Sequence, residues 1–301
     1  MVEKLIDFLL KTQNADGGWG AVPGKRSQTE ATALALLGLG SVKDRALSVH
    51  MEKGLQWLTN QQKADGSWPV SAQVTESSWS TTFAILTLTV LGVQAPRVLR
   101  GAQWVLEQKA QTLGWRESVR YRWAPETMVT LLNPDLQGWS WVPSSFSWVE
   151  PTAYALIALK KLRPLLDDSR TRGRIRQGDL LLYDRMCEDG GWNYGNKLVL
   201  GEKLPPYPDI TAVALIALQD QQAEAANQQS LQVLVNLLGQ THSGLTLSWA
   251  IICAALYGLE ASKWRGLLAT AYEKTGFLDE TRSHALALLA LVDEHVLAFR
   301  V

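Results

Sequence analysis

Three carboxylates stand at equivalent places in three apolar segments of this sequence. Glu30, Glu150 and Asp209 each lie two residues before a threonine that opens a run rich in alanine and leucine. Two later segments carry Leu247 and Arg282 at that place. If these segments form helices around a ring, their N-termini face one end, so three carboxylates and an arginine converge on one opening. Mutual repulsion and burial would then raise the pKa of one carboxyl group, as a general acid requires.

An acid of this kind can protonate an alkene or an epoxide and start a carbocation cascade, in which aromatic faces stabilise the cation. We therefore predict Asp209 as the proton donor, with Glu150 and Glu30 as further catalytic residues. The alternative is helix capping, because an acid at a helix start satisfies free N–H groups and meets the positive end of the dipole, worth about 0.5–2 kcal/mol. The sequence leaves both interpretations open.

Aromatic and basic side chains near the same helix starts would line a cavity. Trp79, Tyr154 and Trp249 lie on the first turn of apolar segments, where packing in the core is the alternative interpretation. For His284, on another apolar segment, the alternative is a hydrogen-bonded core histidine. The residues predicted to bind a ligand are Trp79, Trp148, Tyr154, Trp192, Tyr207, Trp249, Arg282 and His284.

A repeated pattern provides the elements that would position these side chains. An amphipathic stretch ends in Gln, an acid-Gly-x-Trp turn follows, and a segment rich in Thr, Ala and Leu comes next. The pattern reads FLLKTQNADGGWG at Phe8–Gly20 and WLTNQQKADGSW at Trp57–Trp68. It returns with more drift from Trp104 to Trp115 and from Tyr183 to Gly195. Such self-similarity is typical of folds in which neighbouring repeats bury a shared core.

The repeats predict twelve helices in two classes. Segments that are apolar on every face should be buried on every face: Thr29–Leu39, Ser80–Leu91, Glu150–Leu159, Asp209–Leu218, Leu245–Leu259 and Thr281–Leu291. Segments with one charged side should lie outside them: Val2–Gln13, Met51–Gln62, Arg97–Gln108, Thr171–Cys187, Gln228–Gln240 and Ser262–Lys274. Alternation of the two classes predicts an all-α, (α/α)6 double-ring barrel. We expect a single toroid over residues 1–301, with irregular loops at about 109–149 and 196–208.

Composition excludes several classes of partner. Lys and Arg together number 29, as do Asp and Glu, so no net field draws the chain to nucleic acid. No apolar run approaches the roughly 20 residues that span a bilayer, which leaves room for peripheral membrane contact only. Two cysteines, Cys187 and Cys253, make no disulfide framework, and the first segment is an amphipathic helix instead of a signal peptide. These features predict a cytoplasmic location.

The repeats resemble the QW motifs of squalene-hopene and oxidosqualene cyclases. KGLQWLTNQQKADGSW at Lys53–Trp68 fits that pattern almost position for position, and FLLKTQNADGGW fits as well. Similar repeats build the beta subunits of protein prenyltransferases. The resemblance implies a barrel whose aromatic-lined central cavity binds an apolar, isoprenoid ligand without a cofactor. It also implies class II terpene cyclase-like activity, as an isomerase or lyase.

Two departures from those cyclases concern the acid and the size. Squalene cyclases carry DxDD followed by Thr-Ala, with the central Asp as proton donor; YPDITAV here places Asp209 at that position. Tyr207 and Ile210 replace the first and last acids. Oxidosqualene cyclases also keep a single Asp. In those enzymes neighbouring cysteines strengthen the Asp as an acid, and Ile210 cannot take that role here. Those cyclases use two barrels with the cavity between them, and one barrel is predicted here.

The resemblance to protein prenyltransferases raises the question of zinc. Asp209 falls where their zinc-binding Asp stands, but Thr211 replaces the cysteine two residues later. Their zinc-binding His falls at Ser283, one residue short of His284. Because a zinc site needs several matched ligands, we predict no metal.

Three functions therefore remain open. The first is acid-initiated, metal-independent cyclisation or isomerisation of an isoprenoid. The second is a non-catalytic module that binds a lipid or a peptide on the same barrel. The third is carbohydrate chemistry, since (α/α)6 barrels also host glycosidases, which pair two carboxylates in an aromatic cleft.

Overall fold

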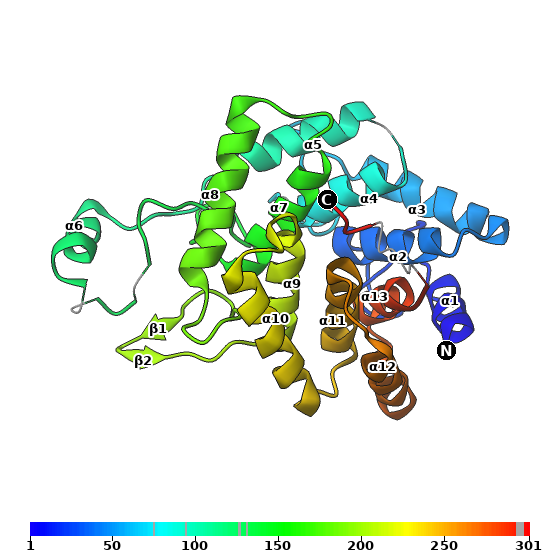
Figure 1. Ribbon diagram of the computed structural model, residues 1–301. Coiled ribbons are helices and arrows are strands. Elements are labelled where there is room, and N and C mark those ends of the chain that lie inside the picture. The colour runs from blue at the N-terminus through cyan, green and yellow to red at the C-terminus, as the bar shows by residue number, and fades with distance from the viewer. Residues whose placement is uncertain (75, 94, 126–127, 131, 293–297) are drawn as a thin grey trace. The chain divides into compact units, whose positions relative to one another are not determined.

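The computed structural model describes residues 1–74, 76–93, 95–125, 128–130, 132–292 and 298–301. The chain forms two compact units. The first unit comprises Met1–Val105 with Thr241–Arg300, and the second comprises Leu106–Gln240 with Val301. Both units are built almost entirely of helices (Figure 1).

The first unit has an inner layer of buried helices and an outer layer of amphipathic ones. The inner helices are α2 (Thr29–Ser41), α4 (Ser80–Val90), α11 (Gly244–Tyr257) and α13 (Thr281–Val292). The outer helices are α1 (Val2–Lys11), α3 (Ser48–Asn60), α5 (Ala95–Glu107, which runs into the second unit) and α12 (Ser262–Thr275), with short 3-10 turns at Arg45–Leu47 and Gly276–Asp279. Helix α13 packs on α2 and α11, and α2 packs on α4, so segments from the two ends of the chain lie side by side (Figure 1).

The second unit repeats this layering. Its inner helices are α7 (Val149–Lys161) and α9 (Pro208–Ala217), which pack on each other, on α8 (Ser169–Arg185) and on α10 (Ala225–Leu237). Its remaining elements are α6 (Trp115–Trp123), the antiparallel pair β1 (Leu198–Val199) and β2 (Glu202–Lys203), and 3-10 turns at Gln219–Gln221 and Leu238–Gln240.

The predicted all-α class with two kinds of helix is confirmed. Each of the twelve predicted segments coincides with a helix, and the apolar segments are buried on nearly every face. Loop 109–149 contains α6, and segment 196–208 contains the β1–β2 hairpin. Closure of all the inner helices into a single toroid over residues 1–301 stays a prediction.

The turn tryptophans join each outer helix to the inner helix that follows it. Each indole N–H donates to a carbonyl ten residues earlier, at 2.6–2.7 Å, in the pairs Trp19–Leu9, Trp68–Leu58 and Trp192–Leu182. Each backbone N–H of these tryptophans donates to a threonine hydroxyl on the next inner helix at 2.9 Å, in the pairs Trp19–Thr32, Trp68–Thr81 and Trp192–Thr211. The threonine of each acid-x-Thr segment is therefore a structural residue.

The glycine and glutamine of the turn have the roles that their chemistry suggests. Gly17 adopts a φ of +92°, and a Cβ there would lie 2.6 Å from the carbonyl oxygen of Lys53. The Gln13 amide donates to the carbonyls of Gly17 and His50, which links the turn to the next outer helix. Gly66 and Gln62 repeat this arrangement in the second turn.

The third repeat corrects one sequence assignment. Its turn tryptophan is Trp139, whose backbone N–H donates to Thr152 Oγ1 at 2.9 Å. Trp115, which the pattern suggested, is 74% exposed at the start of α6. The reason is an insertion: α6 and its flanking loops separate the outer helix α5 from the turn, so proximity along the chain misled the assignment.

Replacement of Thr211 by Val should destabilise the protein, because the backbone N–H of Trp192 would be buried without an acceptor. Such a loss costs about 1–3 kcal/mol, so the midpoint of thermal unfolding should fall measurably. Thr211→Ser keeps the hydroxyl and should lose less. Equal midpoints for the two variants, measured by circular dichroism, would contradict this role.

Candidate functional site

The inner helices present the three predicted acids on the side opposite the outer layer. Thr32, Thr152 and Thr211 contact the turn tryptophans and therefore face outwards. A residue two positions earlier is rotated by about 200° around a helix with 3.6 residues per turn. The acids at those positions, Glu30, Glu150 and Asp209, consequently face away from the outer helices of their own unit.

Asp209 is the second residue of α9 and is partly buried. Pro208 begins the helix, a position where its fixed φ suits the helical turn and its missing N–H costs no hydrogen bond. Tyr207 stands before it in an extended conformation, and its N–H donates to the Trp192 carbonyl at 2.8 Å. The carboxylate thus lies at the positive end of the helix dipole.

Glu150 lies at the neighbouring helix start. It is buried and accepts a 2.5 Å hydrogen bond from the Tyr154 hydroxyl, one turn further along α7. A phenol that donates to a carboxylate forms a strong, charge-assisted hydrogen bond. Tyr154 therefore orients Glu150, a partnership that the four-residue spacing allows but that was not predicted.

The segment from Trp192 to Tyr194 brings the starts of α7 and α9 together. The N–H of Val149 donates to the Tyr194 carbonyl at 3.0 Å, and that of Tyr207 donates to the Trp192 carbonyl. The rings of Tyr194 and Tyr207 lie 5.5 Å apart at 49°. Glu150 and Asp209 thus occupy adjacent helix starts beside a pair of half-exposed tyrosines.

The first unit places Glu30 beside a cation. Arg282 Nε lies 3.4 Å from Glu30 Oε1, and both side chains are largely buried. Thr281, at the start of α13, donates its N–H and hydroxyl to the Ala21 and Gly20 carbonyls, which holds α13 beside the turn that precedes α2. A cation at this distance stabilises the charged carboxylate, so Glu30 is better suited to position other groups than to release a proton.

Trp79 takes the place of the acid in the second repeat. It precedes α4, stands two residues before Thr81, and its ring packs edge-to-face on Phe83 at 5.9 Å. Helix α2 packs between α13 and α4. The residues at the position equivalent to the predicted acids are Arg282 for α13, Glu30 for α2 and Trp79 for α4. In the second unit, Trp148 precedes α7 and donates its N–H to the Trp139 carbonyl.

His284 is a core histidine and faces the outer layer. Its ring stacks on Phe8, with centroids 3.6 Å apart, and meets Tyr272 and Phe277 edge-to-face. It occupies the position that Thr32 has in α2, which explains its orientation. Burial lowers the pKa of His284 below its ordinary value. The prediction that it binds a ligand is therefore withdrawn.

Two predicted ligand tryptophans have packing roles instead. Trp192 is fully buried, and its indole and backbone N–H groups are both committed to the repeat. Trp249 is almost fully buried and meets Phe299 edge-to-face at 5.1 Å. Whether each tryptophan lies in the core or lines a cavity depends on how its helix or turn is rotated, and the sequence composition does not determine that rotation.

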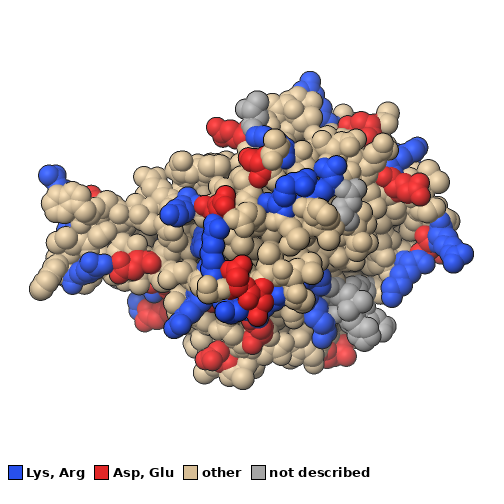
Figure 2. Space-filling model, turned by 90° about the horizontal axis from the view of Figure 1, so that it is seen from above, with Lys and Arg blue, Asp and Glu red and all other residues tan. Residues whose placement is uncertain are grey.

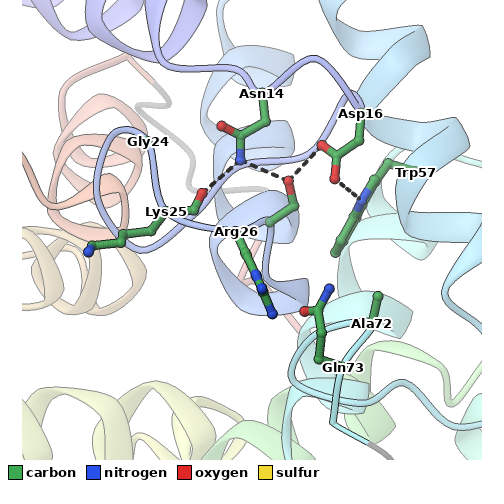
Figure 3. A pocket seen from close by; sticks show the side chains of 9 residues that line it. Asn14, Asp16, Gly24, Lys25, Arg26, Trp57, Ala72 and Gln73 are labelled. Atoms are coloured by element: carbon green, nitrogen blue, oxygen red, sulfur yellow. Dashed lines mark hydrogen bonds between the residues drawn. The ribbon is translucent and has the colours of Figure 1, made fainter.

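A polar pocket of about 470 Å³ lies in the first unit, where sequence reasoning predicted no site (Figure 3). Asp16 forms one wall: it accepts hydrogen bonds from the Gly18 N–H, the Ser27 hydroxyl and the Trp57 indole. The exposed side chains of Lys25, Arg26 and Gln73 also line it, together with Asn14, Gly24 and Ala72. Asp16 is the one acid among the described lining residues, so the pocket does not provide the two carboxylates of a glycosidase.

Part of the chain is similar to a known family of domains and to two cyclases. Residues 1–116 match the prenyltransferase alpha-alpha toroid domain. Lanosterol synthase from Mus musculus is 36% identical over 78 residues, which cover 23% of this chain and 10% of that protein. Squalene–hopene cyclase from Alicyclobacillus acidocaldarius is 25% identical over 200 residues, which cover 63% of this chain and 28% of that protein. Residues 1–116 are thus similar to the prenyltransferase alpha-alpha toroid domain, and longer stretches of the chain are similar to parts of these two cyclases.

Solved structures are similar to the chain at the level of the fold. A variant of the type II terpene cyclase MstE from Scytonema, in complex with its substrate geranylgeranyl dihydroxybenzoate, has a TM-score of 0.60 at 12% identity, covering 99% of this chain and 96% of that one. An alpha-amylase from Clostridium perfringens has a TM-score of 0.61 at 13% identity, covering 96% and 97%. At these identities the likeness concerns the fold alone. The aligned part is only about a tenth to just over a quarter of the cyclase relatives' length.

The buried His284 predicts that the stability of this protein depends on pH. Because its pKa is depressed in the folded state, the unfolded chain takes up a proton first, near the ordinary value of about 6.5. The contribution of His284 to the free energy of unfolding is therefore present above that pH. It is lost as the pH falls further, through the pKa of His284 in the folded state.

Unfolding midpoints measured between neutral and mildly acidic pH should fall more steeply for wild type than for His284→Gln. His242→Gln, at an exposed position, is the matched control and should follow wild type. Parallel curves for wild type and His284→Gln would show that His284 does not carry this dependence.

Proposed function

We propose that this chain is a terpenoid-cyclase-like protein that binds an apolar isoprenoid at the starts of its inner helices. We further propose metal-independent, acid-initiated cyclisation or isomerisation, with Asp209 as the donor. The observation that carries the proposal is the placement of Asp209. It is the second residue of α9, is partly buried and faces away from the outer layer, and it follows Tyr207, whose ring lies 5.5 Å from that of Tyr194.

The sequence setting of Asp209 supports its choice over the other two acids. Glu30 is paired with Arg282, and Glu150 accepts the Tyr154 hydroxyl. Glu150, which lies in the same unit as Asp209, would stabilise positive charge near the donor. Asp209 also stands in the acid-x-Thr-Ala setting that resembles the donor segment of the cyclases.

In the proposed reaction, the carboxyl O–H bond of Asp209 breaks as its proton bonds to an alkene carbon or an epoxide oxygen. The electron pair of the alkene, or the opening of the epoxide, leaves a carbocation that neighbouring double bonds attack. The aromatic faces of Tyr207 and Trp148, together with Tyr154, would stabilise the cation. Loss of a proton from carbon to a base ends the cascade, and a proton returns to Asp209.

Asp209→Asn tests the proposed chemistry. Asn still caps a helix, so the protein should stay folded, but it delivers no proton, and turnover should fall at least about 10²-fold. Glu150→Gln and Glu30→Gln are matched controls and should lose less. Squalene, oxidosqualene and shorter linear isoprenoids would be incubated with each variant, and the products separated by gas chromatography. Undiminished turnover by Asp209→Asn would remove this residue from the mechanism.

A non-catalytic module that binds a lipid or peptide is the alternative within the same fold. Wild-type protein that binds these isoprenoids and returns them unchanged would favour it. The alpha-amylase of similar fold supports carbohydrate chemistry as a third possible function. The described residues around the Asp16 pocket, however, do not include a second acid. Assays with oligosaccharides would separate this third function, and a cytoplasmic location stays a prediction.

Metal independence has its own test. Thr211 and Ser283 stand where the resemblance to prenyltransferases would require a cysteine and a histidine, and the Thr211 hydroxyl is committed to Trp192. We expect elemental analysis of the purified protein to find no stoichiometric zinc, and chelators to leave unfolding and ligand binding unchanged. One zinc per chain, lost in Asp209→Asn, would contradict this expectation.

A further inference from the structure

The polar pocket of the first unit lies between two loops that each precede an inner helix (Figure 3). One loop carries Arg26 and leads into α2, and the other carries Gln73 and leads into α4. The N–H and the hydroxyl of Thr29 donate to the carbonyls of Val70 and Pro69, at 2.9 and 2.6 Å. These hydrogen bonds join the start of α2 to the second loop. The walls of the pocket are therefore held in place before a ligand binds, which lowers the entropy cost of binding.

Two neighbouring cations on the first loop have no ion pair. Acidic and basic side chains are interspersed on the face shown in Figure 2. Lys25 and Arg26, in contrast, are exposed and have no ion-pair partner among the described residues. The repeat does not require these charges: Asp16 and Asp65 stand 49 residues apart, and the same spacing places Val and Thr, at positions 74 and 75, where the first repeat has the two cations. Unpaired positive charge beside a pocket attracts an anionic ligand.

Arg26 and Gln73 provide donors for the charged group of such a ligand. In Figure 3 their side chains extend towards the same part of the pocket, and Lys25 points away from it. The Gln73 amide has no hydrogen-bond partner among the described residues, and Glu76, on the same loop, is not among the described residues of the lining. A guanidinium group and an amide offer N–H donors that match the oxygens of a phosphate or a carboxylate. Lys25 adds positive charge at the rim.

The opposite wall of the pocket offers acceptors. The Asp16 carboxylate accepts hydrogen bonds from three donors of the protein, at 2.7–3.1 Å: the Gly18 N–H, the Ser27 hydroxyl and the Trp57 indole. A carboxylate has about four lone-pair sites, so one site remains for a donor of the ligand. The Asn14 amide nitrogen donates to the Lys25 carbonyl and the Ser27 hydroxyl, which leaves the amide oxygen as a further acceptor. Hydroxyl groups are suited to these acceptors.

We propose that this pocket binds a small hydroxylated anion, either a sugar phosphate or a sugar acid. Its charged group would bind Arg26 and Gln73, and its hydroxyl groups would donate to Asp16 and Asn14. The volume of about 470 Å³ lies within the range of roughly 300–1,000 Å³ that is typical of small-molecule sites. An apolar isoprenoid is unsuited, because it would cover these polar groups without giving them partners. The proposal is independent of Asp209, which belongs to the second unit, and of the proposed reaction.

Isothermal titration calorimetry of the full chain tests the proposal with four probes: glucose 6-phosphate, gluconate, glucose and inorganic phosphate. At least one of the two hydroxylated anions should bind, and the one that binds more tightly identifies the charged group. Glucose and inorganic phosphate should each bind at least about tenfold more weakly, because each lacks one half of the recognised chemistry. Arg26→Gln should raise the Kd about tenfold or more, since it removes charge-assisted hydrogen bonds, and Gln73→Ala should raise it about two- to tenfold.

Arg45→Gln is the matched control. Arg45 is exposed in the same unit and lies outside the described lining, so its replacement removes the same charge and should leave the Kd unchanged. Circular dichroism would check that every variant is folded. Binding that Arg26→Gln leaves unchanged would overturn the proposal, as would wild-type protein that binds neither hydroxylated anion. Glucose or inorganic phosphate bound as tightly as the hydroxylated anions would also overturn it.

Discussion

One hydrogen bond organises this molecule: the backbone N–H of a turn tryptophan donates to the threonine hydroxyl on the inner helix that follows. It recurs at Trp19, Trp68, Trp139 and Trp192 with the same 2.9 Å distance. The bond sets the rotation of four inner helices, α2, α4, α7 and α9, about their own axes. That rotation decides which side chains face the outer layer and which face away.

The candidate chemistry depends on this rotation. Because the threonine is committed to the outer layer, the position two residues earlier faces the other way in every repeat, whatever residue occupies it. The residue at that position differs between the repeats. Glu30 is paired with the Arg282 guanidinium, and Trp79 provides an aromatic ring. Glu150 accepts a hydrogen bond from a phenol hydroxyl, and Asp209 follows a proline. The same position of the repeat thus carries side chains of different chemistry in each of the two units.

Insertions serve a different purpose from the repeats. Helix α6 and the β1–β2 hairpin interrupt the pattern before Trp139 and before α9, yet the hydrogen bonds of Trp139 and Trp192 to their threonines survive. The repeated arrangement of outer helix, turn and inner helix therefore tolerates inserted segments next to the turns. The inserted segments thus leave the inner helices in the same arrangement as in the uninterrupted repeats.

The sequence by itself determined the helices, their two classes and the position of the acids, because apolar periodicity and turn chemistry are local properties. It could not show that Trp139, and not Trp115, is the turn tryptophan of the third repeat, because an insertion changes which segments are in contact. Nor could it show that Glu30 pairs with Arg282, that Asp16 holds Trp57, or that His284 stacks on Phe8. Those partners lie far apart along the chain, and only tertiary packing brings them within hydrogen-bond or van der Waals distance.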